Sequence, residues 1–91
     1  MFRMTDEDVF VIRNRGTVAT GLVESGTLRV GDTVAIDGKI DARVDGIEIF
    51  RKSTDAAGAG DNIGVLFKTV DKGQIGRGSV LTAAGESAFL I

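Results

Sequence analysis

The stretch that decides the fold runs from Phe10 to Asp32 and reads F-V-I-R-N-R-G-T-V-A-T-G-L-V-E-S-G-T-L-R-V-G-D. Short apolar runs with many β-branched residues alternate there with glycines at positions 16, 21, 26 and 31. β-Branched residues favour extended strands, and glycine allows the positive φ angles that tight turns require. The stretch therefore predicts short strands that reverse direction quickly.

The rest of the chain has the same character, with 13 glycines and no proline in 91 residues and no long helical period. We expect an all-β fold, a small closed six- to seven-stranded Greek-key β-barrel. A β-sandwich is the alternative, but at this size it would leave two sheet edges open. The expected strands lie near Asp8–Asn14, Thr17–Glu24, Thr33–Asp37, Lys39–Lys52 (interrupted), Asn62–Phe67 and Ser79–Thr82.

Turn signals divide these strands. Ser25-Gly26 and Asp37-Gly38 predict hairpin turns, and Asp45-Gly46 predicts a bulge or bend inside a long strand. Val70–Gly76 is expected to form one helical turn, and the small residues of Ser53–Gly60 a loop. The glycines at positions 16, 21, 46 and 64 are expected at corners or close backbone approaches.

The length predicts one domain over residues 1–91, with a core of about residues 5–85 and an apolar tail over 86–91. The tail is expected to pack on the barrel or on a partner, because a free apolar end lowers solubility. No apolar run is long enough to cross a bilayer, no signal peptide is recognisable, and there is no cysteine. We therefore expect a cytoplasmic protein without a membrane partner.

The composition narrows the chemistry. Without histidine or cysteine the chain has no His general base, no Cys nucleophile and no typical zinc site. A net charge of -2 argues against a broad basic surface for DNA. The glycines of Gly58–Gly64 do not match G-x-G-x-x-G, and no P-loop motif occurs. We expect no enzyme activity, no nucleotide or other cofactor, and no metal.

The segment Gly46–Lys52 contains a candidate binding surface. If it is a strand, Ile47 and Ile49 point to the core, while Glu48 and Phe50 point outward with Arg51 at the end. An aromatic ring can stack on a flat group, a carboxylate can accept hydroxyl hydrogen bonds, and a guanidinium can pair with phosphate. The alternative is that the N-terminal segment or the apolar tail covers Phe50.

The first expected strand and the basic residues leave further alternatives open. Val9 and Val11 alternate with apolar residues at positions 10 and 12, so this strand is buried on both sides or has one face against another surface. The adjacent acids Glu7 and Asp8 are a candidate acid–base or metal pair, or solvated turn residues. The bases form a local rim or are interspersed surface charge, and they are Arg13, Arg15, Arg51, Lys52 and Lys68.

Several segments together resemble the second domain of bacterial elongation factor Tu, a β-barrel that occurs across translational GTPases. The resemblance extends from about residue 5 to residue 85. The segments are Asp8–Phe10 (D-V-F), Arg15–Gly21 (R-G-T-V-A-T-G), Val30–Asp32 (V-G-D), Gly46–Lys52 (G-I-E-I-F-R-K) and Ala59–Leu66 (A-G-D-N-I-G-V-L).

In that factor the barrel holds the aminoacylated 3′ end of transfer RNA against the GTPase domain. The resemblance implies that Glu48 meets the terminal ribose or adenine and that Arg51 steadies the backbone phosphates. It implies that Phe50 and Asn62 line the aminoacyl group. The chain departs from the family at Asn14, where glycine is usual, and it has no counterpart of the GTPase domain. The implied RNA- or aminoacyl-end-binding residues are Glu7, Asp8, Phe10, Thr20, Glu48, Phe50, Arg51 and Asn62.

The sequence thus predicts a non-catalytic, translation-related binding module that contacts the aminoacylated 3′ end of transfer RNA. The alternative is a protein-interaction module that docks on a translational GTPase, the ribosome or another factor. A third interpretation is that the chain is a piece of a longer factor.

Overall fold

The computed structural model describes residues 1–84, and it confirms an all-β fold in which every strand pair is antiparallel. A single 3₁₀ turn, η1 (Lys72–Gln74), lies within the segment where one helical turn was predicted. The strands are β1 (Arg3–Ile12), β2 (Gly16–Ser25), β3 (Thr27–Arg29), β4 (Thr33–Ile36), β5 (Ile40–Arg43), β6 (Gly46–Ile49), β7 (Lys52–Thr54), β8 (Ala56–Gly58), β9 (Asn62–Phe67) and β10 (Val80–Ala83).

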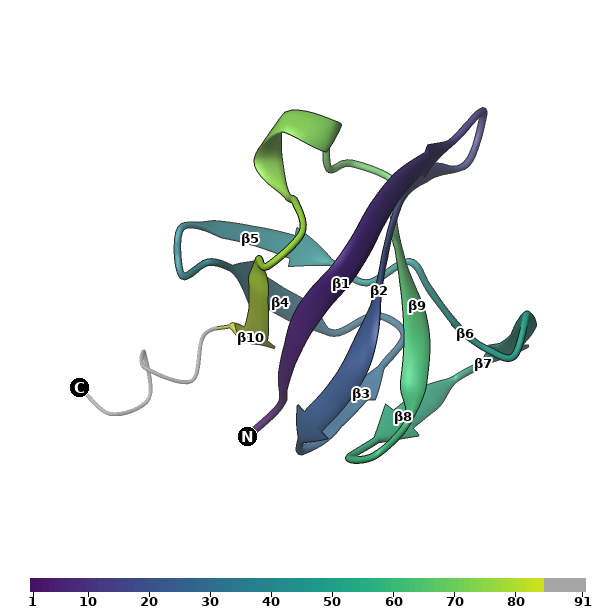
Figure 1. Cartoon of the computed structure of the whole chain (residues 1–91), viewed down its shortest axis with the longest axis vertical. Coiled ribbons are helices and arrows are strands. Elements are labelled where there is room, and N and C mark those ends of the chain that lie inside the picture. The colour runs from purple at the N-terminus through teal and green to yellow at the C-terminus, as the bar shows by residue number, and fades with distance from the viewer. Residues whose placement is uncertain (85–91) are drawn as a thin grey trace.

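Eight of the strands form one sheet in the order β5-β4-β10-β1-β2-β9-β6-β7, and β3 pairs separately with β8. The sheet curls around its inner face (Figure 1). Its end strands, β5 and β7, are not paired with each other in the described part of the chain. The segment that follows β3 bridges the residues next to these two strands instead: Val30 N–H donates to the carbonyl of Asp55, which follows β7, and Gly31 N–H to the carbonyl of Val44, which follows β5, each at 2.9 Å. The architecture is a curled half-barrel, and full closure of the expected barrel is not confirmed.

The core fills the inside of the curl. Alternate residues of the strands point inward, and their burial removes apolar surface from water. Phe67 and Leu81 lie at its centre with no exposed surface. The largest fully buried side chains are Phe67, Met4, Leu28, Ile36, Ile47, Leu81, Val23, Val34, Val44 and Val65.

Two turn predictions are confirmed. Asp37-Gly38 joins β4 to β5, with φ angles of 54° and 68° that suit a hairpin turn of the primed type. Asp45-Gly46 lies at the break between β5 and β6, where the Asp45 N–H donates to the Leu66 carbonyl at 2.9 Å.

Three boundary predictions are wrong. Ser25-Gly26 is not a hairpin turn, because β3 pairs with β8 and not with β2; Gly26, at φ 74°, bends the chain between the two strands. The first strand begins at Arg3 instead of Asp8, since its first residues pair with β10. The segment Ser53–Gly60 contains short strands instead of a loop.

Backbone crowding is confirmed at two of the four glycines. A Cβ atom on Gly21 would collide with the Thr5 carbonyl oxygen, and one on Gly16 with the Phe67 carbonyl oxygen. At Gly46 and Gly64 a Cβ atom would make contacts of 3.5 Å and 3.4 Å, which are near the ordinary packing range, so close approach does not explain them.

The apolar tail predicted over residues 86–91 lies outside the described residues. Within residues 1–84, no helix has the length and apolar character that crossing a membrane would require.

Candidate binding site

Seven of the eight site residues predicted from the sequence line one open hollow of about 290 Å³, which we call the small hollow. It lies on the outer side of the sheet and is bordered by β1, β2, β9 and the β6–β7 turn. Its lining residues are Glu7, Phe10, Val18, Thr20, Gly21, Glu48, Phe50, Arg51, Asn62, Ile63 and Gly64. The structure therefore brings together residues that are up to 55 positions apart in the chain, since Glu7 and Asn62 both contribute.

The turn between β6 and β7 presents the aromatic and the base. Ile49 pairs with Lys52, so Phe50 and Arg51 are the two central residues of a tight hairpin turn. Their φ angles are 52° and 65°, in the left-handed region that favours glycine. The expectation that the strand continues to Lys52 is therefore wrong. Phe50 is nevertheless outward, with 90% of its surface exposed, and nothing in the described chain covers it.

A β-bulge in β1 positions Glu7. Asp6 lies opposite Gly21 and Asp8 opposite Thr20, so Glu7 is an extra residue in this ladder. The bulge turns Glu7 toward the small hollow, where Phe10 also contributes with 43% of its surface exposed. Burial of the first strand on both sides is therefore not observed.

Asp8 is the one predicted site residue that the structure does not bring to the small hollow. Its Oδ1 accepts a hydrogen bond from the Val9 N–H at 3.0 Å, so its carboxylate is engaged by its own strand. Its carbonyl accepts a long hydrogen bond of 3.5 Å from Thr20 Oγ1. Both hydrogen bonds of Asp8 are thus made within β1 and to β2, next to the bulge.

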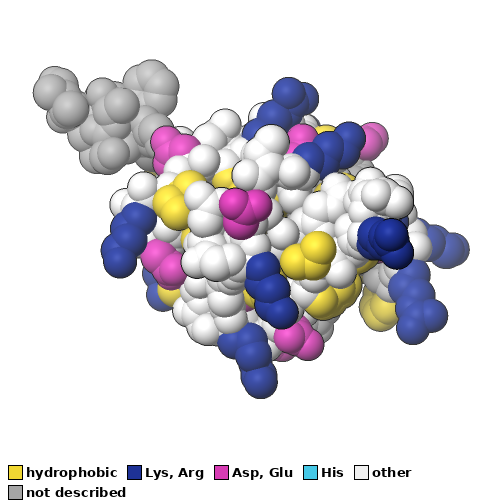
Figure 2. All heavy atoms as spheres, turned by 90° about the horizontal axis from the view of Figure 1, so that it is seen from above, with side chains coloured by type: hydrophobic (Ala, Val, Ile, Leu, Met, Phe, Trp, Pro, Cys, Tyr) yellow, Lys and Arg dark blue, Asp and Glu magenta, His cyan; other side chains and the backbone are white. Residues whose placement is uncertain are grey.

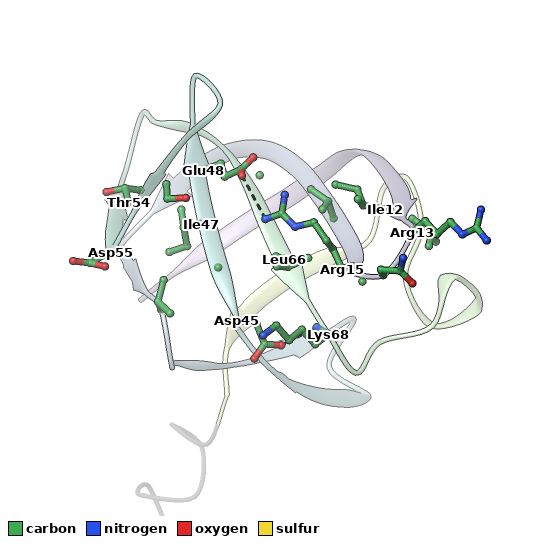
Figure 3. Close-up of a pocket in the computed structure, with 18 residues that line it drawn as sticks. Ile12, Arg13, Arg15, Asp45, Ile47, Glu48, Thr54, Asp55, Leu66 and Lys68 are labelled. Carbon is green, nitrogen blue, oxygen red and sulfur yellow. Dashed lines mark hydrogen bonds and ion pairs between the residues drawn. The ribbon is translucent and has the colours of Figure 1, made fainter.

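A larger groove of about 990 Å³ adjoins the small hollow (Figure 3). It lies between the β1–β2 turn, β6, β7 and the end of β9, and Glu48, Val18 and Gly64 line both cavities. Val18 lies directly opposite Leu66 in the β2–β9 ladder, so both can supply its apolar floor. Sequence reasoning missed this floor, although alternation along β2 and β9 was available as a signal.

One ion pair crosses the groove. Arg15 Nη2 lies 3.8 Å from Glu48 Oε2, and Figure 3 shows the two side chains meeting while Arg13 extends away from the groove. At the other end, Asp45 Oδ2 accepts a hydrogen bond of 2.7 Å from the Lys68 N–H. The groove can therefore offer both a carboxylate and a guanidinium to a ligand.

The predicted basic rim is only partly assembled. Arg13, Arg15 and Lys68 line the larger groove and Arg51 the small hollow, but Lys52 lines neither. The face shown in Figure 2 carries basic side chains both at its margin and within it, with acidic ones between them. Residues 1–84 contain no cluster of three or more acidic residues able to hold a metal ion.

A curled all-β half-barrel with two adjoining surface cavities places the chain in the class of small β domains. The chain belongs to the family described as elongation factor Tu domain 2, whose model matches residues 16–82. The resemblance inferred from the sequence is thereby confirmed.

Two solved structures are similar over most of the chain. Translation elongation factor SelB from Methanococcus maripaludis, in its apo form, is 36% identical with a TM-score of 0.84, over 90% of this chain. A bacterial selenocysteine-specific elongation factor EF-Sec is 25% identical with a TM-score of 0.84, over 91% of this chain. The chain spans only 18% and 14% of the lengths of these proteins.

Proposed function

We propose that the chain is a non-catalytic, translation-related binding module that receives the aminoacylated 3′ end of a transfer RNA. The observation that carries this proposal is the convergence of seven predicted residues on one hollow that shares Glu48 with a larger groove. Such a role in translation places the protein in the cytoplasm.

The two cavities suit the two parts of such a ligand. The larger groove has the volume of a typical small-molecule site, for which roughly 300–1,000 Å³ is usual. In the proposed complex the terminal base lies on the Val18 and Leu66 side of that groove. The aminoacyl group enters the small hollow beside Phe50 and Asn62.

Glu48 is the junction of the proposed complex, because it lines both cavities. Its carboxylate accepts hydrogen bonds from the terminal ribose hydroxyls, which lie between the base and the aminoacyl group. Arg51 projects from the β6–β7 turn and pairs with the backbone phosphate. The contacts with ribose hydroxyls would favour RNA over DNA.

The proposed binding is weak when the module acts alone. Both cavities are open, so a ligand is enclosed on one side only and keeps much of its contact with water. Association also depends on salt, because phosphate contacts release counterions.

The test is an NMR titration of the full chain, at low salt, with an aminoacylated RNA stem that carries the 3′ end of transfer RNA. Shifts are expected at Glu48, Phe50, Arg51 and Asn62. The Arg51→Gln variant should bind at least threefold more weakly, while Lys39→Gln, which removes the same charge at the distant β4–β5 turn (Figure 1), should bind as the wild type. The absence of shifts in these residues would refute the proposal.

A protein-docking role is the second candidate, favoured by the exposure of apolar side chains. Val11, Leu22 and Val30 expose 56%, 42% and 41% of their surface. A translational GTPase, the ribosome or another factor could cover them. Shifts at these three residues with a purified factor, and none with the RNA stem, would favour this role over RNA binding.

A further inference from the structure

Asp6 in β1 is a buried carboxyl group that the proposed binding role does not use. Only 2% of its surface is exposed, and neither side-chain oxygen has a hydrogen-bond partner among the described residues. Its backbone is fully engaged: the N–H donates to the Ser79 carbonyl, and the carbonyl accepts from the Gly78 N–H, each at 2.8 Å. A charged carboxylate in such a place is strongly disfavoured, because it has lost its water and gained no donor.

No basic residue among residues 1–84 forms an ion pair with Asp6. The described residues contain two ion pairs, Arg3 with Glu24 and Arg15 with Glu48, and neither includes it. From β2 it faces Gly21, which has no side chain. The surroundings of Asp6 on these strands therefore favour the uncharged form.

The charged groups on the other elements around Asp6 do not shift its preference to the ionised form. The β4–β5 turn contributes the carboxylate of Asp37, which accepts hydrogen bonds from Ser79 Oγ at 2.9 Å and from the Val80 N–H at 2.8 Å. Lys39 in the same turn lies beside Asp37, and its charge helps to lower the pKa of the Asp37 carboxyl. Arg77 donates a hydrogen bond from Nε to the Glu7 carbonyl at 3.2 Å. The charged residue of η1 is Lys72, which is exposed.

We propose that Asp6 is held as a neutral carboxylic acid and that its ionisation is a pH-sensitive switch for the junction between β1 and the Gly76–Ser79 segment. Burial, and then the charge of Asp37, raises the pKa of Asp6 to about 7. In an opened junction the side chain meets water and returns to its ordinary pKa of 3.8. Opening is therefore coupled to loss of one proton.

The sign of the effect follows from these two values. Below about pH 4 both states are protonated and the junction has its full stability. Between about pH 4 and pH 7 only the open state ionises, so the opening constant rises roughly tenfold per pH unit and levels off above pH 7. Because Glu7 follows Asp6 in the bulge, and Arg77 holds the Glu7 carbonyl, opening displaces one wall of the small hollow.

Two measurements on the full chain test this proposal. The first follows the side-chain carboxyl carbon of Asp6 by ¹³C NMR against pH, with no substitution. The second measures amide hydrogen exchange at residue 6 and at Gly78 in the wild type and in Asp6→Asn, with Asp41→Asn as a control that removes an exposed carboxylate on β5. Comparison with Asp6→Asn at each pH cancels the intrinsic pH dependence of exchange.

We expect the carboxyl carbon to titrate near pH 7. The opening constant of the wild type should rise relative to Asp6→Asn by about fiftyfold from pH 5 to pH 7, and Asp41→Asn should follow the wild type. Titration near pH 4, or a ratio that does not change with pH, would overturn the proposal. Saturable stabilisation by Mg²⁺ or Ca²⁺ alone that Asp6→Asn abolishes would also overturn it, since Asp6 would then be a cation ligand.

Discussion

The β6–β7 turn exposes Phe50 and Arg51, and we expect its backbone conformation to lower the stability of the domain. Each lies at a positive φ angle, 52° and 65°, and a left-handed conformation costs a residue with a side chain roughly 1–2 kcal/mol. Asn-Gly is the preferred pair for this turn type. The double variant Phe50→Asn, Arg51→Gly should therefore relieve most of this strain.

The replacement of Phe50 removes little stabilising burial of apolar surface. Full burial of a phenylalanine contributes about 1.5–3 kcal/mol, and Phe50 is 90% exposed, so its removal forfeits only about 0.2 kcal/mol. We expect a net gain of about 2 kcal/mol in the free energy of unfolding. In a domain of this size the gain corresponds to a rise in Tm of roughly 10 °C.

Urea denaturation followed by far-UV circular dichroism measures the gain, because the chain has no tryptophan or tyrosine for fluorescence. The control is Asn14→Gly in the β1–β2 turn, where Asn already tolerates φ 65°, so its stability should change by less than about 0.5 kcal/mol. In the RNA titration the double variant should bind at least tenfold more weakly. The reasoning is refuted if the double variant is no more stable than the wild type, or if its RNA binding is undiminished.

Three further substitutions test single contacts. Gly21→Ala should lower the free energy of unfolding by about 2–3 kcal/mol, since its Cβ atom would meet a β1 carbonyl. The control is Gly73→Ala, where a Cβ atom has open space and should cause no loss. An equal effect of both substitutions would contradict the crowding at Gly21. Ser79→Ala removes the hydroxyl that donates to Asp37 at 2.9 Å and should cost about 1–2 kcal/mol in thermal denaturation, so an unchanged Tm would argue against that bond. Arg15→Gln breaks a half-exposed ion pair and should change stability by at most about 0.5 kcal/mol. It should leave the dependence of log affinity for the RNA on log salt unchanged, because the proposed phosphate partner is Arg51, and a slope reduced by roughly 0.7 would move that contact to Arg15.

Alternation and glycine spacing were sufficient to predict the all-β class and much of the strand layout. Asp37-Gly38 was predictable as a turn because both residues tolerate positive φ angles. Phe50-Arg51 was not, since neither residue type is a turn signal, and the turn forms because the flanking residues of β6 and β7 pair. Gly26 gave the opposite error, because a hairpin turn was predicted there. Its positive φ angle bends the chain without reversing it.

The composition of the small hollow was predictable by resemblance, and its shape was not. The bulge at Glu7 depends on the register of β1 against β2, which a single strand does not reveal. The position of Asp8 outside the small hollow was unpredictable for the same reason, because one extra residue in a ladder redirects the side chains around it. Asp6 was overlooked entirely, since a single acid before a run of acids gives no sign that the fold buries it.

The position of β10 has a consequence for how the chain assembles. Among the strands of residues 1–84, β10 lies between β4 and β1, and it is the one that connects the β4–β5 hairpin to the remainder of the large sheet. During synthesis the two parts cannot join until Val80–Ala83 has left the ribosome, so a shorter nascent chain holds two unpaired edges. We therefore expect the domain to form in one late, cooperative step, and a truncation before Val80 to aggregate instead of folding as a smaller sheet.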